Sequence, residues 1–466
     1  MILDSQPTSH KLTPQVETAV SRAIEQPGLG LCVLGSERTH TVVTSHDIRF
    51  LFNFFRNHPE YAGNILLFHQ CRFERQSLRQ FKLFEDLGDD ARTCLSDLRL
   101  LSCPIDSQGV DIVLRSLNPS KMRRISMINV NATGSVVGES ICHLFSEKFC
   151  LHSLIVELNS NNLKKEGAEF VGKGLRSLEY PLQRLDLSAC SLGDEGGALI
   201  LNSFSERTRI SLNELVLDEN DLGLQTLEAL SKCLSFSTNL KELSLNDNPG
   251  LFARTSPSLI SNAQLKLDFK RSIEHNGSLE RIFLRRTGVT EQTLVPYSDK
   301  ETPSCFLELL LEGLEANKSL RLLDVQKNKM PFDRLALLLS EQMPKVVELA
   351  EFSISIYGVS WEKVSRDFDR AFYCNFSLLS VHLELFDLQG GDEVSAYNDA
   401  ESHYQLHSKL ARLRQRNAFF RKAKQLCQSR NIGFRKPLWP LGLEWFAKNN
   451  RSLDSLYFCV CNYFTY

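Results

Sequence analysis

The chain has 466 residues, of which 42% are hydrophobic and 24% are charged, values typical of a folded soluble protein. Its formal net charge of -2 gives no global field that would attract nucleic acid or a membrane surface. The polar N-terminal sequence lacks the basic and apolar regions of a signal peptide, and no apolar run is long enough to predict a membrane span.

The first 60 residues do not follow the pattern that governs the rest of the chain. We expect a helix after Thr13, a strand near 29–33, and a second helix that opens with a capping box at Thr44 and Asp47. Without a cap, the first unit of a stacked array would expose the edge of its hydrophobic core to water. Residues 1–60 are therefore predicted to form an N-terminal cap.

A pattern of the form LxxLxLxx(N/C)xL then recurs along the chain. The clearest copies begin at Leu182, Leu212 and Leu240, and earlier copies begin near Leu66, Leu95, Met122 and Val156. Apolar residues at helical spacing, as in residues 166–178 and 225–234, lie between the predicted strands. Each unit is therefore predicted to be a strand, a turn and a helix, which gives an α/β repeat architecture.

Later copies begin at Leu279, Leu320, Leu349, Leu378 and Leu453. A polar stretch at 389–401 is predicted to be a loop, and residues 402–443 contain many Lys and Arg but no Asp or Glu. We predict repeats over 61–390, a basic helical insertion over 391–440 and a terminal repeat over 441–466. The basic segment has three interpretations: a packed helix with a solvated basic side, a surface for an acidic partner or phosphate, or a nuclear-import or membrane-surface element.

The 13 cysteines form no repeated CxxC pairs, so a disulfide framework is not expected and the reducing cytoplasm, or the nucleus, fits the composition better. Four of them, Cys71, Cys103, Cys190 and Cys461, occupy the Asn/Cys position of the repeat and are predicted to be buried.

Four Asn-x-Ser sequons resemble glycosylation sites. All of them, at Asn276, Asn317, Asn375 and Asn450, come just before the first Leu of a repeat. Asn favours the turn geometry required where a helix ends and a strand begins. We therefore predict that these residues build turns rather than carry sugars.

Units of this length, with Cys alternating with Asn, resemble the ribonuclease-inhibitor-like class of leucine-rich repeats. Related arrays occur in NOD-like receptors and in Ran GTPase-activating protein. The resemblance covers about residues 61–390 and 450–466. It implies a right-handed solenoid, or horseshoe, with parallel strands on the concave face and helices on the convex face.

The exposed strand positions define the candidate binding surface, because side chains alternate between the two faces of a strand. Six acidic residues precede two basic ones along the chain. The predicted partner-binding residues are Glu157, Asp186, Glu214, Asp218, Glu242, Asp247, Arg281 and Arg285. This set of residues predicts binding to a protein whose charges are complementary in order. The alternative is that the charges are solvated and bind no partner.

No catalytic or metal-binding pattern stands out. Gly172-Lys-Gly174 lacks the frame of a phosphate-binding loop, and Cys459 with Cys461 lacks two further zinc ligands. We therefore expect no enzyme, cofactor or metal, and no nucleic-acid partner. The predicted function is a receptor, inhibitor or adaptor that binds a protein; the alternative is a GTPase-activating or ubiquitin-ligase-associated regulator, or a secreted effector.

Overall fold

The computed structural model describes the repeat region and parts of its flanks. The described residues are 11–26, 30–36, 41–58, 65–84, 95–117, 122–146, 154–204, 211–235, 239–252, 259–290, 305–357, 359, 363–364, 375, 377–386, 408, 410–415, 417–418 and 421. The predicted terminal repeat at 441–466, with Cys461 and Asn450, lies outside them. The chain divides into two compact units, Met1–Leu251 and Phe252–Tyr466.

Parallel strands form the sheet of the first unit, one strand from each repeat. In spatial order they are β1 (Leu31–Leu34), β3 (Ile65–His69), β5 (Asp97–Leu101), β6 (Arg124–Ile128), β7 (Leu154–Glu157), β8 (Leu182–Asp186), β9 (Leu212–Val216) and β10 (Glu242–Ser244). A separate parallel pair joins β2 (Thr41–Val43) to β4 (Cys71–Phe73). Because neighbouring strands in the sheet belong to successive repeats, the fold is a leucine-rich repeat solenoid.

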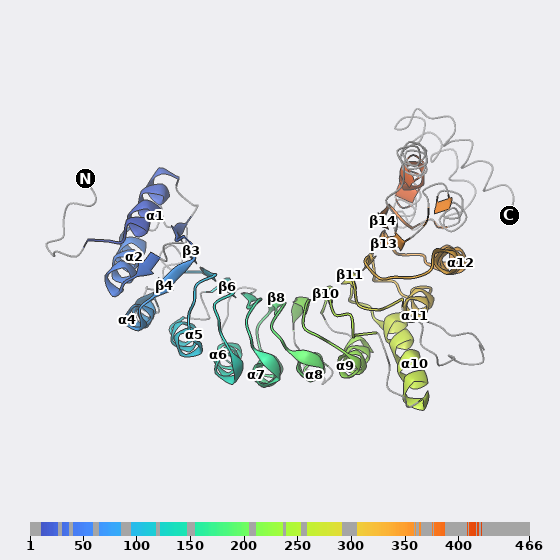
Figure 1. Ribbon diagram of the computed structural model, residues 1–466, viewed down its shortest axis with the longest axis horizontal. Coiled ribbons are helices and arrows are strands. Elements are labelled where there is room, and N and C mark those ends of the chain that lie inside the picture. Colours follow the sequence, from blue (N-terminus) through green and yellow to red (C-terminus); the bar gives the residue numbers. More distant parts are fainter. Residues whose placement is uncertain are drawn as a thin grey trace, which may run out of the picture. The chain divides into compact units, whose positions relative to one another are not determined.

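Helices occupy the opposite side of the first unit from the strands, as Figure 1 shows for α5 to α9. They are α1 (Pro14–Glu25), α2 (Ser45–Asn57), α4 (Arg75–Arg79), α5 (Ser107–Arg115), α6 (Gly134–Ser146), α7 (Lys164–Arg176), α8 (Gly193–Asn202) and α9 (Leu224–Ser235), with a 3-10 turn η1 at Gln80–Phe84. Within this unit the strands line the inner, concave side and the helices the outer side (Figure 1).

The N-terminal helices are fixed to each other by one carboxylate. The capping box predicted at Thr44 is confirmed: its hydroxyl accepts from the amide of Asp47, and the Asp47 side chain accepts from the amide of Thr44. The same carboxylate accepts from the amide and the hydroxyl of Thr13, at 2.9 and 2.6 Å. Thr13 starts α1 without capping it, since its side chain is committed to Asp47.

Buried asparagines connect each repeat to the one before it. Asn220 is fully buried, and its Oδ1 accepts from the amides of Cys190 and Leu192 at 2.9 and 3.2 Å. Its Nδ2 donates to the carbonyls of Leu187 and Asp218. The four bonds satisfy backbone groups that the turn after each strand leaves unpaired in the core. Asn161 and Asn248 make the equivalent bonds two repeats earlier and one repeat later.

Cysteine replaces asparagine at three of these positions, and the prediction that Cys71, Cys103 and Cys190 are buried is confirmed. The thiol of Cys190 donates to the carbonyls of Leu158 and Ser188 at 3.2 and 3.5 Å. The sulfur of Cys103 also accepts from the amide of Cys71 at 3.4 Å, so a thiol takes both roles of the asparagine side chain, although sulfur is a weaker acceptor than an amide oxygen.

Glycines allow the helices of the first unit to stack closely. A methyl group on Gly138 in α6 would lie 2.5 Å from the carbonyl oxygen of Gly167 in α7. One on Gly197 in α8 would lie 2.7 Å from the hydroxyl of Thr226 in α9. The Gly172-Lys-Gly174 stretch, predicted to lie within a helix, is part of α7, and Gly174 contacts the backbone of α6. Its glycines therefore serve packing between helices.

The described part of the second unit contains four parallel strands and longer connecting segments. The strands are β11 (Arg281–Phe283), β12 (Leu322–Val325), β13 (Glu351–Tyr357) and β14 (Ser380–Phe386), in that order. The helices are α10 (Leu259–His275), α11 (Phe306–Gly313) and α12 (Phe332–Gln342), followed by the 3-10 turn η2 (Met343–Lys345). Three aromatic rings, those of Phe252, Phe269 and Phe306, pack together in the core beneath these helices.

The sequon asparagines form a second ladder in this unit. Asn276, Asn317 and Asn375 are at most 3% exposed. The Oδ1 of Asn317 accepts from the amides of Ser319 and Leu320, and its Nδ2 donates to the carbonyls of Ile273 and Asn276. The three asparagines build the turns from helix to strand, as predicted from their position.

Candidate protein-binding surface

The exposed face of the first unit's sheet carries five of the six predicted acidic residues in accessible positions. Glu157, Glu214 and Glu242 are half-buried on β7, β9 and β10, and Asp218 and Asp247 follow their strands. The sixth residue differs, as described next.

Asp186 is 6% exposed, so the prediction that this residue is an accessible strand position is wrong. Its carboxylate accepts from the amide and the hydroxyl of Ser188, at 3.1 and 2.6 Å. Arg184 covers it from the same strand, with Nη2 2.9 Å from Oδ2. The alternation of side chains along the strand correctly predicts the face on which Asp186 lies, but Arg184 and Ser188 cover its carboxylate.

Arg184 lies among three carboxylates from three successive strands. Besides its bond to Asp186, its Nη1 donates to Oε2 of Glu214 at 3.2 Å, and its Nε lies 3.9 Å from Oε1 of Glu157. Glu157 also accepts from the hydroxyl of Ser126 at 2.5 Å. Sequence reasoning missed Arg184, although it occupies the strand position equivalent to Glu214, the residue opposite it in register.

The surroundings shift the pKa of this guanidinium. Burial alone would lower the pKa of Arg184, but hydrogen bonds and charge from Asp186 and Glu214 outweigh it and raise the pKa above its ordinary value. The arginine therefore stays protonated. One positive charge is shared by three carboxylates, which leaves this part of the face net negative.

Asp218 adds a further carboxylate at the ends of β9 and β10. Its side chain accepts from the hydroxyl of Ser244 at 2.7 Å and from the amide of Asn246 at 2.8 Å. Burial raises the pKa of Asp218, and these hydrogen bonds offset part of that increase. Its described hydrogen bonds come from neutral groups, so they do not cancel its negative charge.

The two predicted basic residues belong to the second unit. Arg281 is exposed on β11. Arg285 is bonded to Asp324 of β12, with its Nε and Nη2 2.7 and 2.6 Å from Oδ2. Since Asp324 is 2% exposed, Arg285 covers a buried carboxylate in the way that Arg184 covers Asp186.

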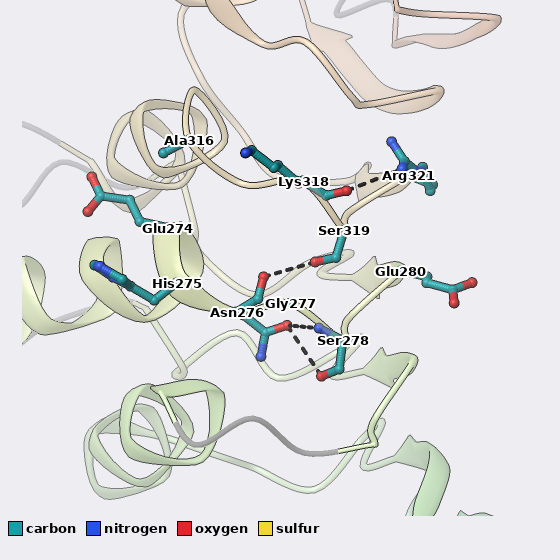
Figure 2. Close-up of a pocket in the computed structure, with 10 residues that line it drawn as sticks. All are labelled: Glu274, His275, Asn276, Gly277, Ser278, Glu280, Ala316, Lys318, Ser319 and Arg321. Carbon is teal, nitrogen blue, oxygen red and sulfur yellow. Dashed lines mark hydrogen bonds between the residues drawn. The ribbon is translucent and has the colours of Figure 1, made fainter. Parts of the chain in front are cut away.

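A depression of about 570 Å³ lies on the side of the second unit where helices end and strands begin. Figure 2 shows it between the turns that contain Asn276 and Ser319. Both acidic and basic side chains line it, including Glu274, Lys318 and Arg321. The hydroxyl of Ser319 donates to the carbonyl of Asn276 at 3.0 Å, so the inner wall is formed by the second asparagine ladder.

Part of the predicted basic segment is described and is helical. Asn417 is fully buried, and its Nδ2 donates to the carbonyls of Asn375 and Leu378 at 3.2 and 2.6 Å. Arg412 and Arg414 are exposed. These residues agree with the interpretation of a packed helix with a solvated basic side; residues 422–443 of the segment lie outside the described part.

The described ranges hold neither a metal-binding cluster nor a membrane-spanning helix. There, no group of three or more His, Cys, Asp or Glu side chains could hold a metal ion. No described helix is both long and apolar enough to cross a membrane. Cys142, Cys233 and Cys305 are free thiols.

Comparisons with known proteins give limited similarity. No family model matches the sequence. The chain is similar to mouse "NACHT, LRR and PYD domains-containing protein 12", with 28% identity over 200 residues, which are 41% of this chain and 18% of that protein. The chain thus matches less than a fifth of that relative's length.

Among solved structures, the fold is similar to a chain in the crystal structure of the Rad7 and Elc1 complex in yeast. The TM-score is 0.40 and the identity 14%, with coverage of 68% of this chain and 67% of that chain. The assignment to the leucine-rich repeat fold rests on the strand order and the asparagine ladder of the chain itself.

Proposed function

We propose that the protein is a non-enzymatic receptor, inhibitor or adaptor that binds another protein through the exposed face of its strands. The observation that carries the proposal is the sharing of Arg184 by Glu157, Asp186 and Glu214. Hydrogen bonds hold these charges in place before a partner arrives, and an ordered charge pattern favours a fast and selective encounter.

The proposed contact residues are the accessible members of the predicted set. Asp186 is buried, so we assign it to holding Arg184 in position rather than to direct contact. The remaining residues are Glu157, Glu214, Asp218, Glu242, Asp247, Arg281 and Arg285.

We also propose the ribonuclease-inhibitor-like subclass and a cytoplasmic location. An α-helix between most successive strands and the alternation of Cys190 with Asn161 and Asn220 in one ladder support the subclass. The free, buried thiols support a reducing compartment.

The test is affinity capture from a cell lysate, followed by affinity measurement on the purified candidate partner. Glu214→Arg should weaken binding of that partner at least tenfold, because the reversal places two adjacent arginines on β8 and β9. Glu228→Arg is the matched control, since Glu228 is exposed on the helix of the same repeat and undergoes the same charge change. Arg281→Glu reports on the second unit.

Circular dichroism and thermal unfolding must first show that every variant keeps its fold. If the affinity is the same for wild type, Glu214→Arg and Arg281→Glu, the strand face is not the binding surface and the proposal is wrong.

A further inference from the structure

The sheet face of the first unit also carries an apolar patch, which consists of Leu34, Leu67, Leu101 and Ile128. Leu101 of β5 is opposite Ile128 of β6, and His69 of β3 lies between Leu101 and Leu34 of β1 in the same register. The patch therefore crosses four adjacent strands on one face.

The patch is accessible to a partner. Leu34 is 44% exposed, and the other three side chains are half-buried. Their strands alternate buried and accessible residues, with Leu66, Phe68 and Leu98 among those that fill the core. The apolar patch is thus additional to the core, and covering it would release ordered water from aliphatic surface.

The aliphatic patch ends at β6, and charged side chains line the same face from β7 onward. Ser188 and Asp218 follow β8 and β9 at the level at which Leu101 and Ile128 end β5 and β6. Beside them lie Arg184 and its three carboxylates.

The same face also carries Asp97 and Arg99 on β5, which form an ion pair, and Arg124 on β6. Counted with Asp218 and the Arg184 group, five carboxylates accompany three guanidiniums, so the charged part of the face has a net negative charge next to the aliphatic side chains.

We propose that the occupant of this face is a protein segment that carries aliphatic side chains for the apolar patch and Lys or Arg side chains for the carboxylates. This inference rests on the proposed function and names the chemistry of the partner. The net negative charge disfavours the phosphates of nucleic acid and of anionic lipid headgroups, whereas it attracts a basic segment.

The strand spacing sets the distance between the two kinds of contact. Ile128 and Leu101 lie three and four strands from Asp218 at the same level of the sheet, which corresponds to roughly 14–19 Å at about 4.8 Å per strand. An extended segment rises about 3.3 Å per residue and a helix about 1.5 Å. The basic and aliphatic residues should therefore be separated by about four to six positions if the segment is extended, or about nine to thirteen if it is helical.

A random sixteen-residue peptide library displayed on phage, panned against the full chain, tests the inference. Enriched peptides should combine Lys or Arg with Leu, Ile or Val at one of these spacings. The affinity of a synthetic peptide from this set should fall at least tenfold with Leu101→Ser and with Glu214→Arg. The matched controls are Val136→Ser and Glu228→Arg, an exposed apolar and an exposed acidic residue on helices of the same unit, and they should change the affinity less than twofold.

The other outcomes separate this inference from the proposed function. One contrary outcome is a set of peptides that bind Leu101→Ser more weakly but contain no basic residue, or whose affinity is unchanged by Glu214→Arg. Such peptides would support the strand face as a binding surface, but they would overturn the inferred chemistry of the partner. If no peptide is enriched, the inference is also overturned, because the face would then not accept a peptide segment. The proposed function is tested separately by the partner captured from the lysate. Self-association of the chain that Glu214→Arg abolishes, measured by sedimentation, would identify a second copy as the occupant and overturn the inference of a separate partner.

Discussion

Both units have a buried asparagine ladder after their strands, which Asn328 continues in the second unit, but the second unit adds buried asparagines where its helices end. In the first unit, Asn220 makes three of its four hydrogen bonds to the preceding repeat, through Cys190, Leu192 and Leu187. In the second unit, Asn317 makes two bonds to its own turn and two to the preceding repeat. The first arrangement fixes the spacing between repeats, and the second also fixes the path from helix to strand.

This difference follows the length of the repeats. In the second unit the 17-residue helix α10 and the segment before α11 lengthen the connections, and a longer connection costs more conformational entropy to hold in place. In the first unit the helices have 13 residues or fewer and approach closely through glycine. The repeats of the first unit are therefore held by helix contacts and one ladder, whereas those of the second unit use an additional ladder at the turn.

The largest expected effect is that of breaking either ladder. Asn220→Ala leaves two amides and two carbonyls in the core without partners and should lower the free energy of unfolding by about 5 kcal/mol. Asn317→Ala removes the same number of bonds and should cost a similar amount. Urea unfolding measures both changes.

Hydrogen exchange read by mass spectrometry shows where each change acts. Exchange should increase around β8 and β9 for Asn220→Ala and around β11 and β12 for Asn317→Ala. A loss below about 1 kcal/mol in one unit would mean that its ladder contributes little to stability there.

A smaller effect is expected from the glycine contacts of the first unit. Gly138→Ala places a methyl group against the backbone of Gly167, and overpacking of this kind costs about 1–3 kcal/mol. Gly277→Ala in the second unit meets open space and should change the stability by less than about 0.5 kcal/mol. Equal melting temperatures for the two variants would show that the close contact of Gly138 contributes little to the stability of the first unit.

The smallest effect concerns Asp218. Because burial raises its pKa in the folded state, the folded chain binds this proton more readily than the unfolded chain, and stability falls as pH rises above the ordinary value near 3.8. Asp218→Asn should match the wild type in stability at pH 3.5 and exceed it at pH 7, by less than about 1 kcal/mol. Thermal unfolding at both pH values measures the difference; a variant that is less stable at pH 7 would show that the bonds from Ser244 and Asn246 need the charge.

Much of the fold could be read from the sequence because its determinants are local. The recurring Leu positions predicted the strands, the Asn/Cys position of the repeat predicted buried cysteines, and Thr44 with Asp47 predicted the start of α2. Each of these signals lies within a few residues along the chain, since side-chain periodicity and capping depend on near neighbours.

The binding surface depended on residues that are distant in the sequence. Alternation placed Asp186 on the exposed face, but only the folded structure put Arg184 and Ser188 over it. The contact of Arg184 with Glu157 and Glu214 joins strands about one repeat apart in each direction. The register of parallel strands determines which of these side chains meet, and that register is fixed by the packing of whole repeats.

By itself, the sequence determined the repeating unit, its buried positions and the set of charged residues available to a partner. The tertiary structure alone decided which charges neutralise one another, that Leu34, Leu67, Leu101 and Ile128 form one apolar patch, and that sequon asparagines form a second ladder. The physical reason is that burial patterns are encoded by local periodicity, whereas net charge and contiguous surface arise only when successive repeats lie side by side.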